Sequence, residues 1–268
     1  MSPWLETCRA AAADVRNVLA ALPTRYEREP VLRAGEGGDD TTAVDGAAEA
    51  AVVARLEELH ARGVDFTLVS EELGERAYGG GPWRVVVDPI DGSNNAKRGI
   101  PFFSLSIAVA DGPAYEDVAF GFVHDFGTGE EWTAERGGGA FLDGARLGTV
   151  RPKEEIEILS FEATTTAYVA ERVGAMVGLA HRVRIMGSLA LSLCHLAAGR
   201  VDAVCSLKPA RSVDIAAAAL LVQECGLALE LFDDPPFAAG LLDLGARSRV
   251  AAAATPELVA RLAGALRD

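Results

Sequence analysis

Short apolar runs rich in β-branched residues recur along this chain, and the segments that join them change in character near residue 150. Before that point, three strand-like segments are joined by Asp-Gly-Pro and Gly-Thr-Gly, which are turn sequences typical of antiparallel strands. These segments are Phe102–Ala110, Val118–His124 and Glu130–Thr133. Beyond residue 151, strand-like and helix-like patterns alternate, as they do in α/β proteins. We therefore expect an α/β protein with an α+β N-terminal half and an α/β C-terminal half.

Hydrophobic periodicity and the positions of Gly and Pro define the other expected elements. Helices are expected at Pro3–Leu22, over a segment that ends near His60, at Ala167–Leu179, at Leu189–Ala198 and at Val213–Cys225. Further strands are expected at Phe66–Ser70, Trp83–Asp88, Ile156–Phe161, Val183–Met186, Val201–Ser206 and Leu227–Leu231. Because no repeat or linker interrupts the pattern, we expect residues 1–148 and 149–268 to form two closely packed halves.

The chain is strongly acidic. It has 25 Lys and Arg against 39 Asp and Glu, a formal net charge of −14 over 268 residues. Such a field repels nucleic acid and anionic membrane surfaces, so we expect neither as a partner. An anionic substrate would need an arginine cluster or bound divalent cations that reverse the sign of the potential at the site.

Cysteine usage and apolar run lengths favour a cytoplasmic protein. The four cysteines form no C-x-x-C pair, and Glu6 lies where a signal peptide would have a basic flank. The longest wholly apolar stretch, Ile215–Val222, is far shorter than the ~20 residues needed to cross a bilayer.

Several enzyme classes lack their motifs here. Only four histidines occur, and there is no G-x-S-x-G, H-E-x-x-H, Walker A or dinucleotide glycine sequence. Serine hydrolase, zinc enzyme and nucleotide-cofactor functions are therefore poorly supported. The acidic residues remain as the candidates for chemistry.

The densest acidic group follows three valines, in the segment Asp88-Pro89-Ile90-Asp91. On a continuous strand, an odd offset would point Asp88 and Asp91 to opposite faces. We expect Pro89 and Gly92 to end the strand, so that a turn brings both carboxylates and the Ile90 carbonyl together. Such a set of hard oxygen ligands suits Mg²⁺.

The next residues, Gly92-Ser93-Asn94, can offer consecutive backbone N–H groups and a hydroxyl to an anion. Metal and phosphate would then share one loop. An ordinary turn has the same composition, and these residues alone do not separate the two interpretations.

Three further acidic positions also have two interpretations each. Glu71 is the expected inward ligand of the Glu71-Glu72 pair, which is otherwise a solvated loop. Asp45 lies three residues after Thr42, the spacing of a capping box, and Asp214 falls in the first turn of a helix, where the macrodipole favours an acid. It is the combination of these positions that indicates a functional site.

The chain resembles the inositol monophosphatase superfamily of Mg²⁺-dependent, lithium-sensitive phosphatases. It looks most similar to the archaeal-type branch, whose members hydrolyse both inositol monophosphates and fructose 1,6-bisphosphate. The segments that carry the resemblance cover nearly the whole chain: Val69-Ser70-Glu71-Glu72, Asp88-Pro89-Ile90-Asp91-Gly92-Ser93 with Asn95, Gly99-Ile100-Pro101-Phe102, Gly187-Ser188 and Asp214-Ile215-Ala216-Ala217.

The resemblance implies metal ligands residue by residue. Glu71, Asp88 and the Ile90 carbonyl would hold one Mg²⁺, and Asp88, Asp91 and Asp214 would hold a second. A third, weaker ion is implied near Glu71, and Mn²⁺ is an expected substitute for Mg²⁺.

The resemblance also implies catalytic and substrate-binding residues. Asp45 would hydrogen-bond Ser93, so that the two orient and deprotonate the attacking water and Asp45 is more than a helix cap. Arg184 is open between a substrate contact and a charge at a strand edge. The implied substrate contacts are Gly92, Ser93, Arg184, Gly187, Ser188 and Arg211.

One departure from the animal-type inositol enzymes bears on specificity. They place a glutamate where this chain has Leu207, whereas Lys208-Pro209-Ala210-Arg211 resembles the basic segment of the archaeal-type enzymes. Arg211 could then receive a second phosphate or the distal part of a sugar phosphate.

The fold implied is a layered α-β-α-β-α sandwich with the site between its halves, and the implied assembly is a homodimer. The expected function is Mg²⁺-dependent hydrolysis of inositol monophosphate, fructose 1,6-bisphosphate or both, by a metal-activated water. One alternative is a 3′(2′),5′-bisphosphate nucleotidase or another sugar or histidinol phosphate phosphatase. Another is a non-catalytic binding or regulatory homologue.

Overall fold

The computed structural model describes residues 3–162, 165–233 and 235–267. Its α-helices are α1 (Pro3–Ala21), α2 (Arg25–Arg28), α3 (Ala43–Ala61), α4 (Ser93–Arg98), α5 (Thr166–Arg172), α6 (Leu189–Ala197), α7 (Ser212–Glu224) and α8 (Pro256–Arg267). Its strands are β1 (Val31–Ala34), β2 (Asp40–Thr42), β3 (Phe66–Ser70), β4 (Gly74–Tyr78), β5 (Trp83–Asp91), β6 (Ser104–Ala110), β7 (Val118–Asp125), β8 (Glu131–Glu135), β9 (Gly139–Leu142), β10 (Ala145–Arg146), β11 (Ile156–Glu162), β12 (Ala180–Arg184), β13 (Ala203–Ser206), β14 (Ala228–Leu231) and β15 (Val250–Ala253).

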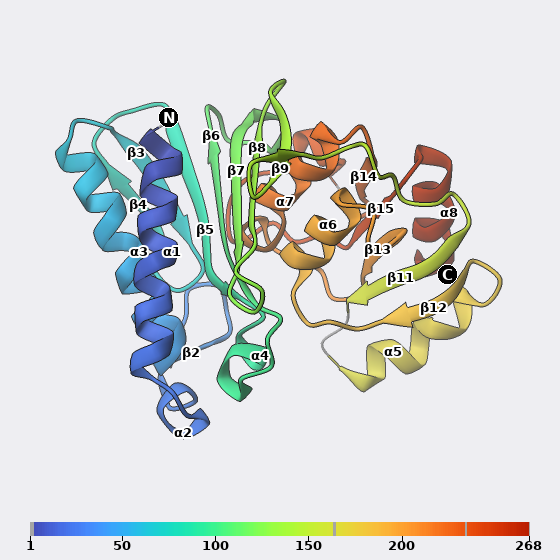
Figure 1. Ribbon diagram of the computed structural model, residues 1–268, viewed down its shortest axis with the longest axis horizontal. Coiled ribbons are helices and arrows are strands. Elements are labelled where there is room, and N and C mark those ends of the chain that lie inside the picture. Colours follow the sequence, from blue (N-terminus) through green and yellow to red (C-terminus); the bar gives the residue numbers. More distant parts are fainter. Residues whose placement is uncertain (1–2, 163–164, 234, 268) are drawn as a thin grey trace.

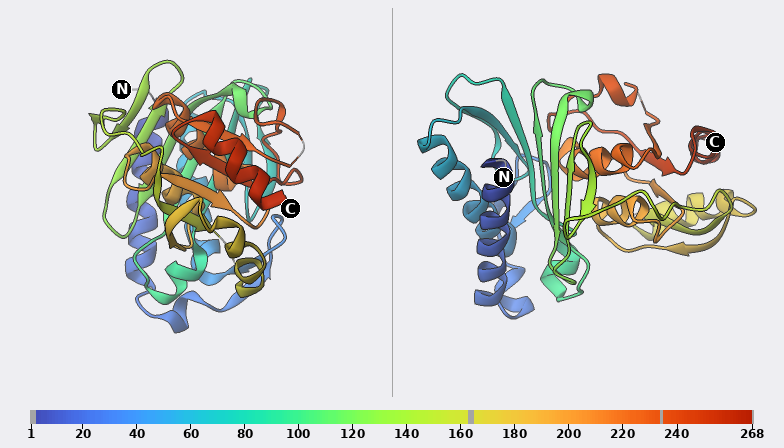
Figure 2. Two further views of the ribbon diagram at one scale, coloured as in Figure 1. Left: turned by 90° about the vertical axis from the view of Figure 1, so that its right-hand side faces the viewer. Right: turned by 45° about the horizontal axis from the view of Figure 1, so that its top comes forward.

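Helices and sheets alternate in five layers across the molecule (Figure 1). Helices α1 and α3 cover the outer face of an eight-stranded sheet, α6 and α7 lie between this sheet and a five-stranded one, and α5 and α8 lie beyond the second sheet. The expected layered α-β-α-β-α sandwich is therefore confirmed. Figure 2 shows the same order from other sides, with the two chain ends in opposite outer layers.

The eight-stranded sheet has the order β10-β9-β8-β7-β6-β5-β3-β4. From β5 to β10 every neighbouring pair is antiparallel, so the expected meander is confirmed and extends two strands further than its apolar runs predicted. Strand β3 is the exception, because it runs parallel to β5. The carboxyl ends of β3 and β5 consequently lie at the same edge of the sheet.

The five-stranded sheet has the order β12-β11-β13-β15-β14, with β11 parallel to both β12 and β13. The predicted helix over 167–179 is shorter than expected: α5 ends at Arg172, a 3₁₀ turn covers Val173–Met176, and β12 begins three residues before the predicted start. Gly174 lies inside that turn, and Gly178 has a φ of +82°, a conformation that ends helices.

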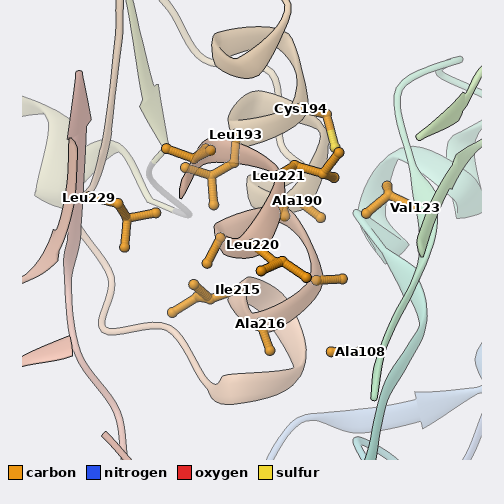
Figure 3. Close-up of a cluster of buried hydrophobic side chains, with 14 of the residues drawn as sticks. Ala108, Val123, Ala190, Leu193, Cys194, Ile215, Ala216, Leu220, Leu221 and Leu229 are labelled. Carbon is orange, nitrogen blue, oxygen red and sulfur yellow. The ribbon is translucent and has the colours of Figure 1, made fainter. Parts of the chain in front are cut away.

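Helices α6 and α7 fill the space between the sheets with apolar side chains (Figure 3). Ala108 and Val123 face them from the larger sheet, and Leu229 faces them from the smaller one. The alanines of α7 allow a close approach to β7, where a Cβ on Gly121 would lie 2.6 Å from the Ala217 carbonyl oxygen. Helix α7 is thereby held rigidly between the layers.

Some elements were not expected from the sequence. Short or exposed strands carry little apolar periodicity, and the smaller sheet receives its antiparallel strand β15 from an alanine run. The elements without a predicted counterpart are β1, β2, β4, β9, β10, β15, α2, α4 and α8.

The two sheets use separate stretches of the chain. The larger sheet ends at Arg146 and the smaller begins at Ile156. We propose that the boundary between the halves lies between residues 148 and 149, in the stretch that joins them. Among the helices that the structure describes, none combines the length and apolar character required to cross a bilayer.

Candidate active site

A cavity of about 440 Å³ opens where the two halves meet. Among the described residues, nine acidic and four basic side chains line it. Its walls come from β5, from the first turns of α3, α4 and α7, and from the ends of β11 and β13. Such an excess of carboxylates creates a potential that attracts cations and repels a free anion.

Glu71 and Asp88 meet because β3 and β5 are parallel. Ser70 pairs with Val87 in the register, and the Glu71 amide donates a 3.3 Å hydrogen bond to the Val87 carbonyl. The Val87 carbonyl thus holds the Glu71 backbone, and Asp88 is the residue that follows Val87 on β5. Both side chains line the cavity, as expected from the sequence.

A bulge brings Asp91 to the same face as Asp88. Asp88 pairs with Ser106 and Asp91 with Ser104, so three residue steps on β5 match two steps on β6. The extra residue cancels the odd offset, because Ser104 and Ser106 lie on one face of their strand. The predicted strand end at Asp88 is therefore wrong: β5 continues to Asp91, and a bulge takes the place of the expected turn.

Asp214 approaches from the opposite side of the cavity, in the first turn of α7. One carboxylate oxygen each of Glu71, Asp88 and Asp214 lie within 4.8 Å of one another. Asp91 lines the same cavity. These four carboxylates provide only hard oxygen donors, which suit Mg²⁺, Mn²⁺ or Ca²⁺ and do not suit soft metals.

The raised pKa values of these carboxyl groups show that their burial close to one another disfavours the charged forms. Burial raises the pKa of Glu71 to about 8. The positive charge of Arg211 lowers this pKa, and the negative charge of Asp214 raises it. Burial and the charge of Asp214 raise the pKa of Asp91 to about 7, and burial with Glu71 raises that of Asp88 well above its usual range. A divalent cation would relieve this mutual repulsion, so the donor set fits a metal.

Asp45 has one bound and one free carboxylate oxygen. Its Oδ2 accepts hydrogen bonds from the Thr42 amide, at 3.2 Å, and from the Thr42 hydroxyl. Its Oδ1 is buried and has no hydrogen-bond partner. The capping box is thus real, and the expected hydrogen bond from Ser93 is absent because the Ser93 hydroxyl donates to the Ile90 carbonyl at 3.0 Å.

The loop after β5 turns sharply at Gly92, whose φ of +95° is the left-handed conformation that glycine adopts most readily. Gly92 and Ser93 line the cavity and begin α4, and the Ile90 carbonyl lies on the same wall. The backbone amide of Ile90 donates to Asp88 Oδ1 at 2.9 Å, which fixes that carboxylate.

Gly187 lines the cavity, as expected from the sequence. Ser188 does not line it but contacts Asp91, which does. The Ser188 hydroxyl donates to Asp91 Oδ2, which also accepts the Ala190 amide at 2.8 Å. Ser188 caps α6 as well, by accepting the Leu191 amide. The side chain of Ser188 therefore orients Asp91, and its expected contact with substrate stays a prediction.

The two predicted arginines are placed very differently. Arg184 is exposed at the sheet edge on β12, donates to the Val183 carbonyl and does not line the cavity, so its expected substrate contact is not supported. Arg211 is 6% exposed, and its guanidinium lies 2.6 Å from Glu71 Oε1 and 2.9 Å from Asp214 Oδ1.

Several cavity residues were not proposed from the sequence. Glu162 ends β11 one residue beyond the predicted strand and accepts the Gly187 amide at 2.9 Å; its signal was an acid at the carboxyl end of a parallel strand. Glu72 also lines the cavity and accepts the Thr41 hydroxyl, so both members of the Glu-Glu pair face inward. Arg247 lies too far along the chain from any motif to be placed by spacing, whereas Lys97 lies two residues after Asn95 and reaches the cavity from α4.

Comparison with known proteins agrees with this fold and site. The sequence model of the Inositol monophosphatase family matches residues 4–268 of this chain. A fructose-1,6-bisphosphatase/inositol-1-monophosphatase from Methanothermobacter thermautotrophicus is 33% identical over 266 residues, which cover 95% of this chain and 93% of the relative. A protein named Nus factor SuhB from Haemophilus influenzae is 33% identical over 236 residues, 84% of each chain.

Solved structures show the same fold. One described as an inositol monophosphatase-fructose 1,6 bisphosphatase superposes with a TM-score of 0.84 at 26% identity, over 99% of this chain and all of the other. A layered sandwich with grouped carboxylates between its halves, matched in this way, defines a phosphatase. The chain belongs to the inositol monophosphatase family.

Proposed function

We propose that this phosphatase hydrolyses inositol monophosphate, fructose 1,6-bisphosphate or both, with Mg²⁺ as its cofactor. The observation that carries the proposal is the approach of Glu71, Asp88 and Asp214 to within 4.8 Å, beside Asp91 and the start of α4. Relatives with 29–36% identity bear both substrate names. The non-catalytic alternative fits poorly, because all four carboxylates line the cavity.

The metal roles follow the donor set. Glu71, Asp88 and the Ile90 carbonyl would hold one Mg²⁺, and Asp88, Asp91 and Asp214 a second, with a weaker third near Glu71 and Mn²⁺ as a substitute. When bound, such ions offset the charge of phosphoryl oxygens and lower the pKa of the attacking water. The Ile90 carbonyl accepts the Ser93 hydroxyl, and a carbonyl oxygen has two lone pairs.

The chain's own residues would orient and deprotonate the water. The Ser93 hydroxyl donates to Ile90, so its oxygen lone pairs remain available to accept a hydrogen bond from water. Asp45 Oδ1, buried without a partner, is the atom that would take the proton. The amides of Gly92 and Ser93 would hold the phosphoryl oxygens at the start of α4.

Exchange of a single ligand tests the site. Asp214→Asn and Asp91→Asn each remove a negative charge while keeping size, so we expect phosphate release to fall to background because cation binding is lost. Glu154→Gln, at an exposed position, is the charge-matched control and is expected to keep wild-type turnover. Circular dichroism should show all three variants folded. Full activity in either Asp variant would remove the metal assignment.

Substrate preference is tested by a panel of phosphate esters. Release of phosphate from inositol 1-phosphate, fructose 1,6-bisphosphate, histidinol phosphate and 3′-phosphoadenosine 5′-phosphate is measured with Mg²⁺ and with EDTA. We expect the first two to react fastest and none to react in EDTA. Preference for 3′-phosphoadenosine 5′-phosphate would indicate the bisphosphate nucleotidase alternative instead.

We also propose a homodimer that acts in the cytoplasm on small phosphate esters. The four cysteines are buried free thiols, which suits a reducing compartment. Light scattering of the purified protein measures the oligomeric state directly, and a monomeric mass at working concentration would contradict the dimer.

A further inference from the structure

Arg211 is the only residue of the cavity whose cationic group contacts the proposed ligands directly, among the described residues. It is the N-cap of α7, three positions before Asp214. Nη2 lies 2.9 Å from Asp214 Oδ1, and Nε donates to Asp214 Oδ2 at 3.2 Å. Nη1 lies 2.6 Å from Glu71 Oε1. The planar guanidinium therefore joins two carboxylates that arrive from opposite halves of the molecule.

These contacts use the oxygens that a cation would need. Both oxygens of Asp214 accept hydrogen bonds from Arg211, and Glu71, whose Oε1 lies nearest to Arg211, is also a member of the proposed donor set. A guanidinium and a divalent ion in one small cavity would repel each other strongly. The two therefore cannot share the donor group.

Arg211 remains charged in this position. Burial lowers its pKa, but Asp214 and Glu71 raise it further, so the net pKa lies above the usual arginine value. Removing one partner of such a buried pair leaves an uncompensated charge. In the absence of a divalent ion, the positive charge of the Arg211 guanidinium offsets the repulsion between these carboxylates.

A third carboxylate lies near the guanidinium, at the edge of the cavity. Asp39, whose side chain is 59% exposed at the edge of the cavity, lies 3.6 Å from Arg211 Nη1. Gly37 borders the same space, and a Cβ there would lie only 2.7 Å from Nη1. The guanidinium is therefore packed closely against Gly37, and Asp39 is the acidic group beside it that does not belong to the proposed donor set.

We propose that Arg211 is an internal counter-ion that competes with divalent cations for Glu71 and Asp214 and turns toward Asp39 when a cation binds. The inference rests on the proposed metal site. It assigns to this arginine a role in setting the metal affinity, in addition to any contact with substrate.

Calorimetric titration of the full chain with Mn²⁺, at constant pH and ionic strength, tests the competition. Arg211→Gln removes the competing charge, so we expect Mn²⁺ to bind about tenfold more tightly than to wild type. Lys97→Gln is the control, because it removes one positive charge from the same cavity, and no ion pair among the described residues joins Lys97 to Glu71, Asp214 or Asp39. This control separates competition for the donor oxygens from the general electrostatic potential of the cavity. Its Mn²⁺ affinity should change by less than about twofold.

Thermal unfolding provides a second readout. In EDTA we expect the midpoint of Arg211→Gln to lie well below that of wild type, because the carboxylates lose their counter-ion. In excess Mn²⁺ the two midpoints should converge. Convergence is specific to exchange of one cation for another, whereas a purely structural role for Arg211 would leave the same deficit under both conditions and would overturn the proposal.

The results separate this inference from the proposed function. Mn²⁺ binding that is equal in wild type and Arg211→Gln, or weaker in the variant, overturns the competition but leaves the metal site intact. A folded wild type that binds no Mn²⁺ overturns both. If Arg211→Gln fails to fold, Arg211→Met decides in the same way, since it also removes the charge and fills the buried position with an apolar side chain: tighter binding than wild type supports the competition, and equal or weaker binding overturns it.

Discussion

Asp91 owes its orientation to helix α6, which belongs to the other half of the chain. Its Oδ2 accepts both the Ser188 hydroxyl and the Ala190 amide. Groups that hold a metal ligand in this way tune its affinity although they never touch the ion. We therefore propose that Ser188, which was expected to contact substrate, positions the proposed metal ligand Asp91.

Ser188→Ala should accordingly weaken Mn²⁺ binding by roughly tenfold, because Asp91 keeps only the Ala190 amide. The loss of the helix cap should also lower the free energy of unfolding by about 1 kcal/mol. Ser188→Thr retains a hydroxyl for both roles and should restore both quantities. Calorimetry and urea unfolding measure them separately. A loss of stability with unchanged Mn²⁺ affinity would show that Ser188 only caps the helix.

At the scale of single elements, the short helix α4 and the bulge before it shape the wall of the cavity. Gly92 and Gly99 cap α4 at its two ends, and both have positive φ. They differ in their surroundings. A Cβ on Gly92 would lie 3.0 Å from the Gly187 carbonyl oxygen, whereas a Cβ on Gly99 would meet nothing within 4 Å.

This difference makes Gly92 and Gly99 a matched pair. Gly99→Ala should cost about 1 kcal/mol of unfolding free energy, the penalty of the left-handed conformation alone. Gly92→Ala should cost about 2 kcal/mol or more, because it adds a clash with backbone that cannot move freely. Thermal or urea unfolding of the two variants measures both costs. Equal destabilisation would mean that the Gly92 loop can shift away from Gly187.

At the scale of the whole molecule, the site depends on how closely the layers pack. Helix α7 has Arg211 as its N-cap and Asp214 in its first turn, and it lies against β7, which belongs to the larger sheet. The contact is closest at Gly121, whose missing side chain admits the Ala217 carbonyl. A shift of this helix would separate ligands that come from different halves.

Gly121→Ala should therefore destabilise the fold by about 2 kcal/mol and also weaken Mn²⁺ binding, although it lies outside the cavity. Gly80→Ala, in an exposed turn with no atom within 4 Å of its Cβ, is the control and should change stability by less than about 0.5 kcal/mol. Unfolding curves combined with calorimetry give both effects. Reduced stability with unchanged Mn²⁺ affinity would indicate that a shift of α7 leaves Asp214 close to the other carboxylates of the cavity.

Much of the architecture was determined by the sequence itself. Alternating apolar runs and turn residues were sufficient for the meander, and the strand Phe66–Ser70 was predicted with its observed bounds, because periodicity and turn chemistry are local properties. The acids Glu71, Asp88, Asp91 and Asp214 were also singled out as candidates, since each lies near the carboxyl end of a strand or in the first turn of a helix.

Only the tertiary structure decided how these acids meet. Whether Asp88 and Asp91 share a face depends on a bulge against β6, and the position of Arg211 depends on the approach of α7 to β3 and β5. The same holds for Arg184 at the sheet edge and for Ser188 behind Asp91. Register, side-chain direction and ion pairing arise from contacts between distant segments, and spacing along the chain contains no measure of those distances.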